Sequence, residues 1–126
     1  MRFMLIVKGD RRTEAGALPG RADIEAMGRF NQQMIEAGVM VDGAGLKPSS
    51  TGAKVTFAGG KVQVTDGPFV ETKDLVSGFW VINVKTRDEA IAWASRVPFQ
   101  HLPGEGRVPE IEVRQFFEPE DFEDLA

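Results

Sequence analysis

The sequence predicts an α+β domain of ferredoxin-like plan with an inserted β-hairpin. Strand-like and helix-like stretches follow one another in the order strand, helix, strand, hairpin, strand, helix, strand. Both helical stretches are amphipathic, and two of the strand-like stretches are apolar on both alternating faces. The length of 126 residues is that of one domain, which we assign to residues 1–126.

Composition excludes several classes of protein and site. The net charge is −4, whereas a nucleic-acid interface needs clustered Lys and Arg, so we expect no direct binding of DNA or RNA. The absence of cysteine excludes disulfides, thiolate metal sites and cysteine nucleophiles, and a single histidine excludes a multi-histidine metal cage. We expect no metal and no cofactor. Because no apolar run approaches a membrane-spanning length and no leader pattern is visible, we expect a cytoplasmic protein without membrane contact.

The first third of the chain predicts a strand, a loop and a helix. Arg2–Lys8 is apolar on both faces, and Gly9–Gly20 is polar without a period, which is typical of a solvated loop. The period becomes helical from Ala22 to Ala37, with Asp23 as the expected N-cap and Gly38 just past the end. The expected core side of this helix carries Ile24, Met27, Met34 and Ile35, with Phe30 at its edge.

Two consecutive glycines predict the clearest local structure, a β-hairpin. Val39–Val41 first begins a strand that we expect to break at Gly43–Gly45, where two glycines indicate a bulge or a close backbone approach. Gly59 and Gly60 then suit a two-residue turn with positive φ at both positions. This turn places four apolar side chains on one face of the hairpin: Val55, Phe57, Val62 and Val64.

The last third predicts a strand, a helix, a strand and a tail. Phe79–Lys85 is apolar on both faces, and Thr86 with Glu89 forms a capping-box pattern before a helix that ends at Pro98. The expected buried side of that helix carries Ala90, Ile91, Ala94 and Val97, with Trp93 at its margin. A Pro- and Gly-rich loop leads to a strand over Glu110–Phe117. The acidic tail Glu118–Asp124 is expected to be solvated and anchored at most by Phe122.

Two helices cover only one face of such a sheet. The second apolar faces of Arg2–Lys8 and Phe79–Lys85 therefore stay uncovered in a single copy. Burying an exposed Phe or Leu is worth ~1.5–3 kcal/mol, so a monomer that exposes several of them is disfavoured. We expect two copies of the sheet to face one another in a homodimer.

The stretch Asp66–Asp74 (Asp-Gly-Pro-Phe-Val-Glu-Thr-Lys-Asp) combines backbone-special residues with reactive side chains. Gly67 and Pro68 define a turn, and Asp66 is able to accept hydrogen bonds from the amides that follow it. An acid, a hydroxyl and an amine come next, within three residues. A loop of this kind between buried strands is a typical position for a site. The candidate catalytic residues are Asp66 and Glu71, and the candidate ligand-binding residues are Gly67, Pro68, Thr72 and Lys73.

Each candidate also has a purely structural interpretation. Asp66 is either a turn residue or a general base at the mouth of a cavity between sheets. Glu71 and Lys73 either point into that cavity or pair with each other or with Arg114, in which case they contribute only ~0–1 kcal/mol. The single histidine, His101, has no carboxylate near it in sequence that would orient it, which favours a loop histidine over a catalyst.

The Asp66-Gly67-Pro68-Phe69 motif, followed by Glu-Thr-Lys, resembles the signature of the YCII-related domain family in its DGPF branch. The resemblance spans the chain through Gly43-x-Gly45-Leu46-x-Pro48, Gly78-Phe79-Trp80, Glu112-Val113-Arg114 and Glu120-Asp121-Phe122. It implies a ferredoxin-like domain of the dimeric α+β barrel type that dimerises sheet to sheet. It implies no single activity: some relatives are encoded with alternative sigma factors, and a distant branch includes a dehydrochlorinase that acts on a chlorinated hydroxyquinol through a histidine–aspartate pair.

The chain departs from the enzymatic branch at two positions. His101 lies in a late loop, whereas that branch keeps its histidine near the first strand or helix, so the histidine–aspartate mechanism is not transferred. Ala44 stands between two glycines where the DGPF branch often has an acid. These departures favour a small-molecule-binding or regulatory module, in which the Asp66–Asp74 loop lines the pocket. The alternatives are a small enzyme that uses carboxylate acid–base chemistry on an aromatic or hydroxylated metabolite, and a protein whose dimer surface is its function.

Overall fold

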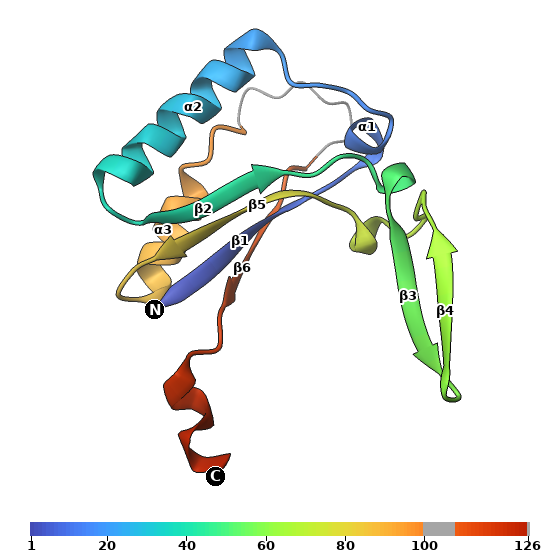
Figure 1. Ribbon diagram of the computed structural model, residues 1–126. Helices are drawn as coiled ribbons and strands as arrows, with labels where there is room; N and C mark the ends of the chain where they lie inside the picture. Colours follow the sequence, from blue (N-terminus) through green and yellow to red (C-terminus); the bar gives the residue numbers. More distant parts are fainter. Residues whose placement is uncertain (100–107, 126) are drawn as a thin grey trace.

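The computed structural model describes residues 1–99 and 108–125 of the protein as an α+β fold (Figure 1). Its elements in chain order are β1 (Arg2–Lys8), α1 (Arg11–Glu14), α2 (Arg21–Glu36), β2 (Met40–Gly45), η1 (Ser49–Thr51), β3 (Ala53–Ala58), β4 (Lys61–Asp66), η2 (Thr72–Asp74), β5 (Val76–Asn83), α3 (Arg87–Ser95), β6 (Ile111–Gln115) and η3 (Pro119–Leu125), where η marks a 3₁₀ helix. Among these residues, no helix is long and apolar enough to cross a bilayer. The cytoplasmic location and the assignment of the chain to one domain stay predictions.

The central sheet has four antiparallel strands in the order β2-β5-β1-β6. The first and third strands of the βαββαβ plan are its central pair, as the ferredoxin-like arrangement requires. The β3–β4 hairpin forms a separate two-stranded sheet between β2 and β5 in the chain. The predicted fold class is therefore confirmed, including the inserted hairpin.

One face of the sheet carries the hydrophobic core. Phe3 pairs with Ile82 and Leu5 pairs with Trp80, and all four are at most 6% exposed. Phe30 and Met34 of α2 and Ala90 of α3 belong to the same buried cluster, so both helices lie on this face. The Trp80 indole stacks edge-on against Phe30 and donates a hydrogen bond to Asn31 Oδ1 at 2.8 Å, which satisfies its buried N–H.

Within residues 1–99 and 108–125, no helix lies on the opposite face of the sheet. Met4 pairs with Val81 and Ile6 with Phe79, and these pairs alternate with the buried ones, so their side chains point the other way. All four remain partly exposed. We call these four side chains the open face. The prediction that a second apolar face stays uncovered is confirmed for the described residues, whereas its packing against another copy stays a prediction.

The core side of α2 differs from the prediction. Phe30 and Met34 are buried, with Met27 packed against them, but Ile24 and Ile35 are 58% and 55% exposed. Phe30 is therefore at the centre of the packed side and not at its edge. The helix also begins earlier, with Gly20 as N-cap, and Asp23 in its third position accepts the Gly20 N–H at 3.2 Å. The glycine expected after its end does have a positive φ of 72°.

β2 continues through the glycines at which it was expected to break. A side chain at Gly43 would place a Cβ only 2.7 Å from Trp80 Cδ1, so the strand needs glycine where it passes the indole. The expectation of a close backbone approach was correct and the expected break was wrong. The register shift lies earlier, between Met40 and Asp42, and Asp42 Oδ1 accepts the Gly43 N–H.

Several element boundaries also differ from the predicted ones. The loop Gly9–Gly20 contains the short helix α1, because Asp10 caps the amides of Arg12 and Thr13. β5 begins at Val76 and ends at Asn83, before Lys85. Thr86 caps α3 as expected, but the Glu89 carboxylate accepts the N–H of Lys85. α3 ends at Ser95, before Pro98, and its expected core residue Ile91 is 37% exposed.

The β3–β4 hairpin has the predicted turn and register. Gly59 and Gly60 have φ values of 58° and 74°, Val55 pairs with Val64, and Phe57 pairs with Val62. Every residue of both strands is exposed. Figure 1 shows the hairpin extending away from the sheet and away from α2. We call residues 53–66 the arm.

Candidate functional site

Gly67, at the start of the predicted site loop, packs directly against the η1 segment. A Cβ on Gly67 would lie 1.8 Å from the carbonyl oxygen of Ser49, and the Gly67 N–H donates to Gly52 O at 3.0 Å. The Gly67–Pro68 peptide is cis. Glycine is thus required here because two backbone segments touch, a reason that the local turn pattern did not contain.

Asp66 does not form the expected Asx turn. It is the last residue of β4, opposite Ala53, and is exposed. The amides after it have other partners: Gly67 donates to Gly52, and Phe69 N–H donates to Ser49 Oγ at 2.8 Å. Within the described part of the chain, the Asp66 carboxylate has no hydrogen-bond partner.

Of the three polar residues after the turn, Glu71 is the N-cap of η2, and Thr72 and Lys73 are its first two residues. Glu71 is the N-cap and makes no side-chain hydrogen bond to the helix, and both Thr72 and Lys73 are exposed. The Lys73 carbonyl accepts a hydrogen bond from Lys8 Nζ at 3.2 Å. Arg114, a possible partner of these residues, pairs instead with Glu112 at 3.0 Å.

A cavity of about 300 Å³ lies beside this loop. Its apolar lining comes from Leu46, Pro48, Phe69, Leu75 and Val76. Its polar lining comes from Glu14, Lys47, Ser49, Thr51 and Asp74, with Gly52 between them. We call it the loop cavity. Phe69 and Asp74 belong to the predicted loop, but the six predicted site residues do not line the cavity, so their catalytic or binding roles stay predictions.

Ser49 joins three segments at the wall of the loop cavity. Its N–H donates to Glu14 Oε1 at 3.0 Å, and its hydroxyl donates to Glu14 Oε2. The same hydroxyl oxygen accepts the Phe69 N–H. This chain of hydrogen bonds ties α1 to η1 and to the site loop, and it directs the Ser49 hydroxyl hydrogen toward a carboxylate.

Asp74 also lines the cavity, in an ion pair with the arm. Lys54 Nζ is 2.5 Å from Asp74 Oδ2, and it also lies 4.5 Å from the centre of the Phe69 ring. The hydrogen bond from Lys54 lowers the pKa of Asp74, and the charges of Lys54, Lys73 and Lys8 act in the same direction. Asp74 is therefore an ionised hydrogen-bond acceptor and a weak general base.

The loop cavity is thus lined by two carboxylates, two hydroxyl side chains and Lys47, together with apolar side chains. Glu14, Ser49, Lys54 and Asp74 were not selected from the sequence. Glu14 lies in a stretch predicted as solvated loop, and its contact with Ser49 spans 35 residues, which no local pattern reveals. Among residues 1–99 and 108–125, no group of three or more His, Asp or Glu side chains is placed to hold a metal ion. His101 lies outside the described residues.

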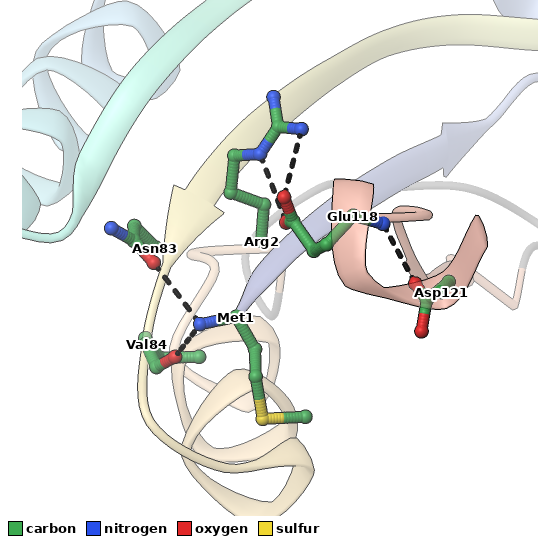
Figure 2. Close-up of polar contacts among 6 residues, drawn as sticks. All are labelled: Met1, Arg2, Asn83, Val84, Glu118 and Asp121. Carbon is green, nitrogen blue, oxygen red and sulfur yellow. Dashed lines mark hydrogen bonds and ion pairs between the residues drawn. The ribbon is translucent and has the colours of Figure 1, made fainter. Parts of the chain in front are cut away.

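A second cavity, of about 360 Å³, lies at the opposite end of the sheet, beside η3. Figure 2 shows Arg2 reaching Glu118 with two nitrogens, at 3.1 and 3.3 Å, and the Met1 amine bound to the Val84 carbonyl at 2.8 Å. The hydrogen bond from Arg2 lowers the pKa of Glu118. The tail is therefore held by an ion pair to β1, and the expectation of an anchor at Phe122 alone was wrong. The Arg2–Glu118 pair joins β1 to the tail, and the Met1 amine joins β1 to the residue that follows β5 by one position, so both contacts have a structural role.

Comparison with known proteins shows which family the chain belongs to. An uncharacterised protein of Rhizobium meliloti (strain 1021) is 36% identical over 72 residues, which are 57% of this chain and 56% of that protein, so the match spans little more than half of that relative. Among solved structures, 5-chloro-2-hydroxyhydroquinone dehydrochlorinase from Burkholderia phenoliruptrix AC1100, in complex with 2,5-dihydroxybenzoquinone, has a TM-score of 0.52, with 13% identity over 96% of this chain and 98% of that chain. This likeness supports the fold. The YCII-related domain matches residues 1–116, so the chain belongs to the YCII-related domain family.

Proposed function

We propose that the protein is a dimeric small-molecule-binding or regulatory module whose loop cavity takes a small hydroxylated ligand with one ring. One observation carries the proposal: a cavity of about 300 Å³ beside the motif loop, lined by carboxylates, hydroxyls and apolar side chains. This volume is at the lower end of ligand pockets, which combine apolar walls with a few placed polar groups.

The polar groups of the cavity favour a hydrogen-bond donor as ligand. Glu14 and Asp74 line the cavity with carboxylates, whose oxygens have acceptor capacity beyond the bonds from Ser49 and Lys54, and Lys47 adds a cationic side chain. Phe69 and Leu75 offer apolar surface to a ring. A ligand with ring hydroxyls matches both properties. The dehydrochlorinase of the same fold is named for a chlorinated hydroxyhydroquinone and holds a dihydroxybenzoquinone, which belongs to this class of molecule.

A second candidate function is a small enzyme for such a metabolite. In that case Asp66 and Glu71 are the candidate acid–base residues, because their carboxylates are exposed and accessible to a substrate. Lys73 is then the candidate anion ligand, with Thr72, Gly67 and Pro68 shaping the loop. The lowered pKa of Asp74 favours binding over acid–base catalysis at the cavity itself.

The dimer of the proposal forms through the open face. Met4, Ile6, Phe79 and Val81 are partly exposed and adjacent in register. Burying such side chains is worth up to ~1.5–3 kcal/mol each, and two copies facing one another bury both sets at once.

A thermal-shift screen tests the proposed ligand class. Dihydroxy- and trihydroxybenzenes are compared with their methyl ethers, which keep the ring and lose the donors. A binder at 100 times its Kd adds about 2.7 kcal/mol to the free energy of unfolding, which raises Tm clearly. Stabilisation by the phenols alone is expected. Equal responses to phenols and ethers, or no response, would overturn the proposal.

Two matched variants then locate the site. Asp74→Asn removes a charge from the loop cavity, and Asp66→Asn removes one outside it. We expect the Asp74 variant to lose affinity for a phenol and the Asp66 variant to keep it, measured by titration calorimetry. The reverse result would move the site to Asp66. Turnover of the bound phenol by wild type, lost in Asp66→Asn or Glu71→Gln, would favour the enzyme.

A further inference from the structure

The arm presents an apolar face that nothing in the described part of the chain covers. Its four side chains are exposed by 52%, 79%, 64% and 62%: Val55, Phe57, Val62 and Val64. The cross-strand pairs Val55–Val64 and Phe57–Val62 make this face continuous. Contiguous apolar patches of this kind on a soluble protein mark interaction sites.

The root of the arm is held in place on both strands. On β3, Lys54 pairs with Asp74 and lies over the Phe69 ring. After β4, Gly67 is packed against Ser49 and bonded to Gly52. These contacts hold the arm away from its own sheet, so the apolar face is available to another molecule.

We infer that the apolar face of the arm docks on a second copy of this chain. The inference rests on the self-association proposed above and adds a second contact surface to it. Facing sheets lie about 10 Å apart, whereas a six-residue strand spans ~20 Å. Figure 1 shows the arm pointing away from α2, which lies on the covered face. An arm longer than this spacing is long enough to reach the flank of the partner's sheet.

Charge also favours another copy as the occupant. The arm contains Lys54, Lys61 and Asp66 and carries a net charge of +1, and because the whole chain has a net charge of −4, the rest carries −5. A basic arm and an acidic body attract one another between copies. Lys54 and Lys61 are on the face of the hairpin opposite the apolar one; Lys54 is paired with Asp74 of its own chain, so Lys61 is the lysine of the arm that is left for the partner.

The area of the arm matches what a stable dimer needs. The exposed parts of Phe57 and the three valines amount to roughly 400 Å² of apolar surface. In a two-fold symmetric dimer both arms dock, one on each partner, and each arm covers an area on the partner similar to its own. The total of roughly 1,600 Å² is that of a standard stable interface.

The test compares dimer dissociation constants, measured by sedimentation at several concentrations. Phe57→Glu is expected to raise the dissociation constant at least ~100-fold, and the milder Val62→Thr about tenfold. Ile24→Glu is the matched control, since Ile24 is 58% exposed on α2, and it is expected to change the constant less than ~3-fold. Circular dichroism checks that each variant folds.

Crosslinking identifies what the arm contacts. Since the protein has no cysteine, Phe57→Cys carries a unique thiol for a photoreactive label. In an equal mixture of ¹⁴N and ¹⁵N copies, crosslinks between light and heavy chains support docking, and crosslinks confined to one copy overturn it.

A third variant, Val81→Glu on the open face, separates the two contacts. If Val81→Glu breaks the dimer and Phe57→Glu does not, the inference about the arm is overturned and the dimer through the open face is supported. If Phe57→Glu breaks the dimer and Val81→Glu does not, the contact through the arm is supported and the contact through the open face is rejected. A wild type that is monomeric at ~100 µM overturns both.

Discussion

Gly67→Ala tests the packing of the site loop against η1. The new methyl carbon would lie 1.8 Å from Ser49 O, a distance that only a backbone shift can relieve. That shift breaks two hydrogen bonds, Gly67 N–H to Gly52 O and Phe69 N–H to Ser49 Oγ. Each is worth ~0.5–1.5 kcal/mol net, and overpacking adds ~1–3 kcal/mol. We expect a loss of about 2–6 kcal/mol in the free energy of unfolding.

Gly28→Ala is the matched control. Gly28 lies inside α2, and a Cβ added there would meet no atom within 4 Å, so the same change should stabilise by ~0.5–1 kcal/mol. Urea unfolding at one fixed protein concentration measures both variants, since self-association makes apparent stability concentration-dependent. A loss below ~0.5 kcal/mol at Gly67, with the expected gain at Gly28, would refute the packing argument.

Two further predictions concern the core and the chain ends. Met34→Ala should cost ~2–5 kcal/mol in urea unfolding and Ile35→Ala less than ~0.5 kcal/mol, and equal costs would contradict the packed side of α2. Glu118→Gln tests the ion pair with Arg2 by unfolding at several pH values. Because the folded-state pKa of Glu118 is below its ordinary 4.5, the pair's contribution is fully present above pH 4.5 and is lost as pH falls through the folded pKa. The stability gap between wild type and variant should therefore close in acid; a gap independent of pH would exclude the pair as its cause.

The arm shows which features were predictable from local sequence. Gly59 and Gly60 allow positive φ at both turn positions, and the turn together with the alternation of Val55 and Phe57 sets the register. All of these interactions lie within a few residues. The uncovered sheet face was predictable for a similar reason, because alternation along a strand determines which side chains share a face.

The core side of α2 needed the tertiary structure. Ile24 and Ile35 are as apolar as Met34, so composition around the helix did not separate them. The position of the sheet beneath the helix did, because Trp80 packs against Phe30 and turns that side of the helix inward. A helical wheel describes periodicity and contains no information on where the neighbouring element lies.

Some features of the candidate site were likewise predictable from the sequence, and others needed the tertiary structure. The sequence by itself determined the family signature, the fold plan and the loop at which a cavity lies. Which side chains line that cavity was decided by contacts between distant residues: Glu14 with Ser49, Ser49 with Phe69, and Lys54 with Asp74. These pairs are separated by 20 to 35 residues. Only the tertiary contacts among α1, η1, the site loop and the first residues of the arm bring these partners within hydrogen-bond distance.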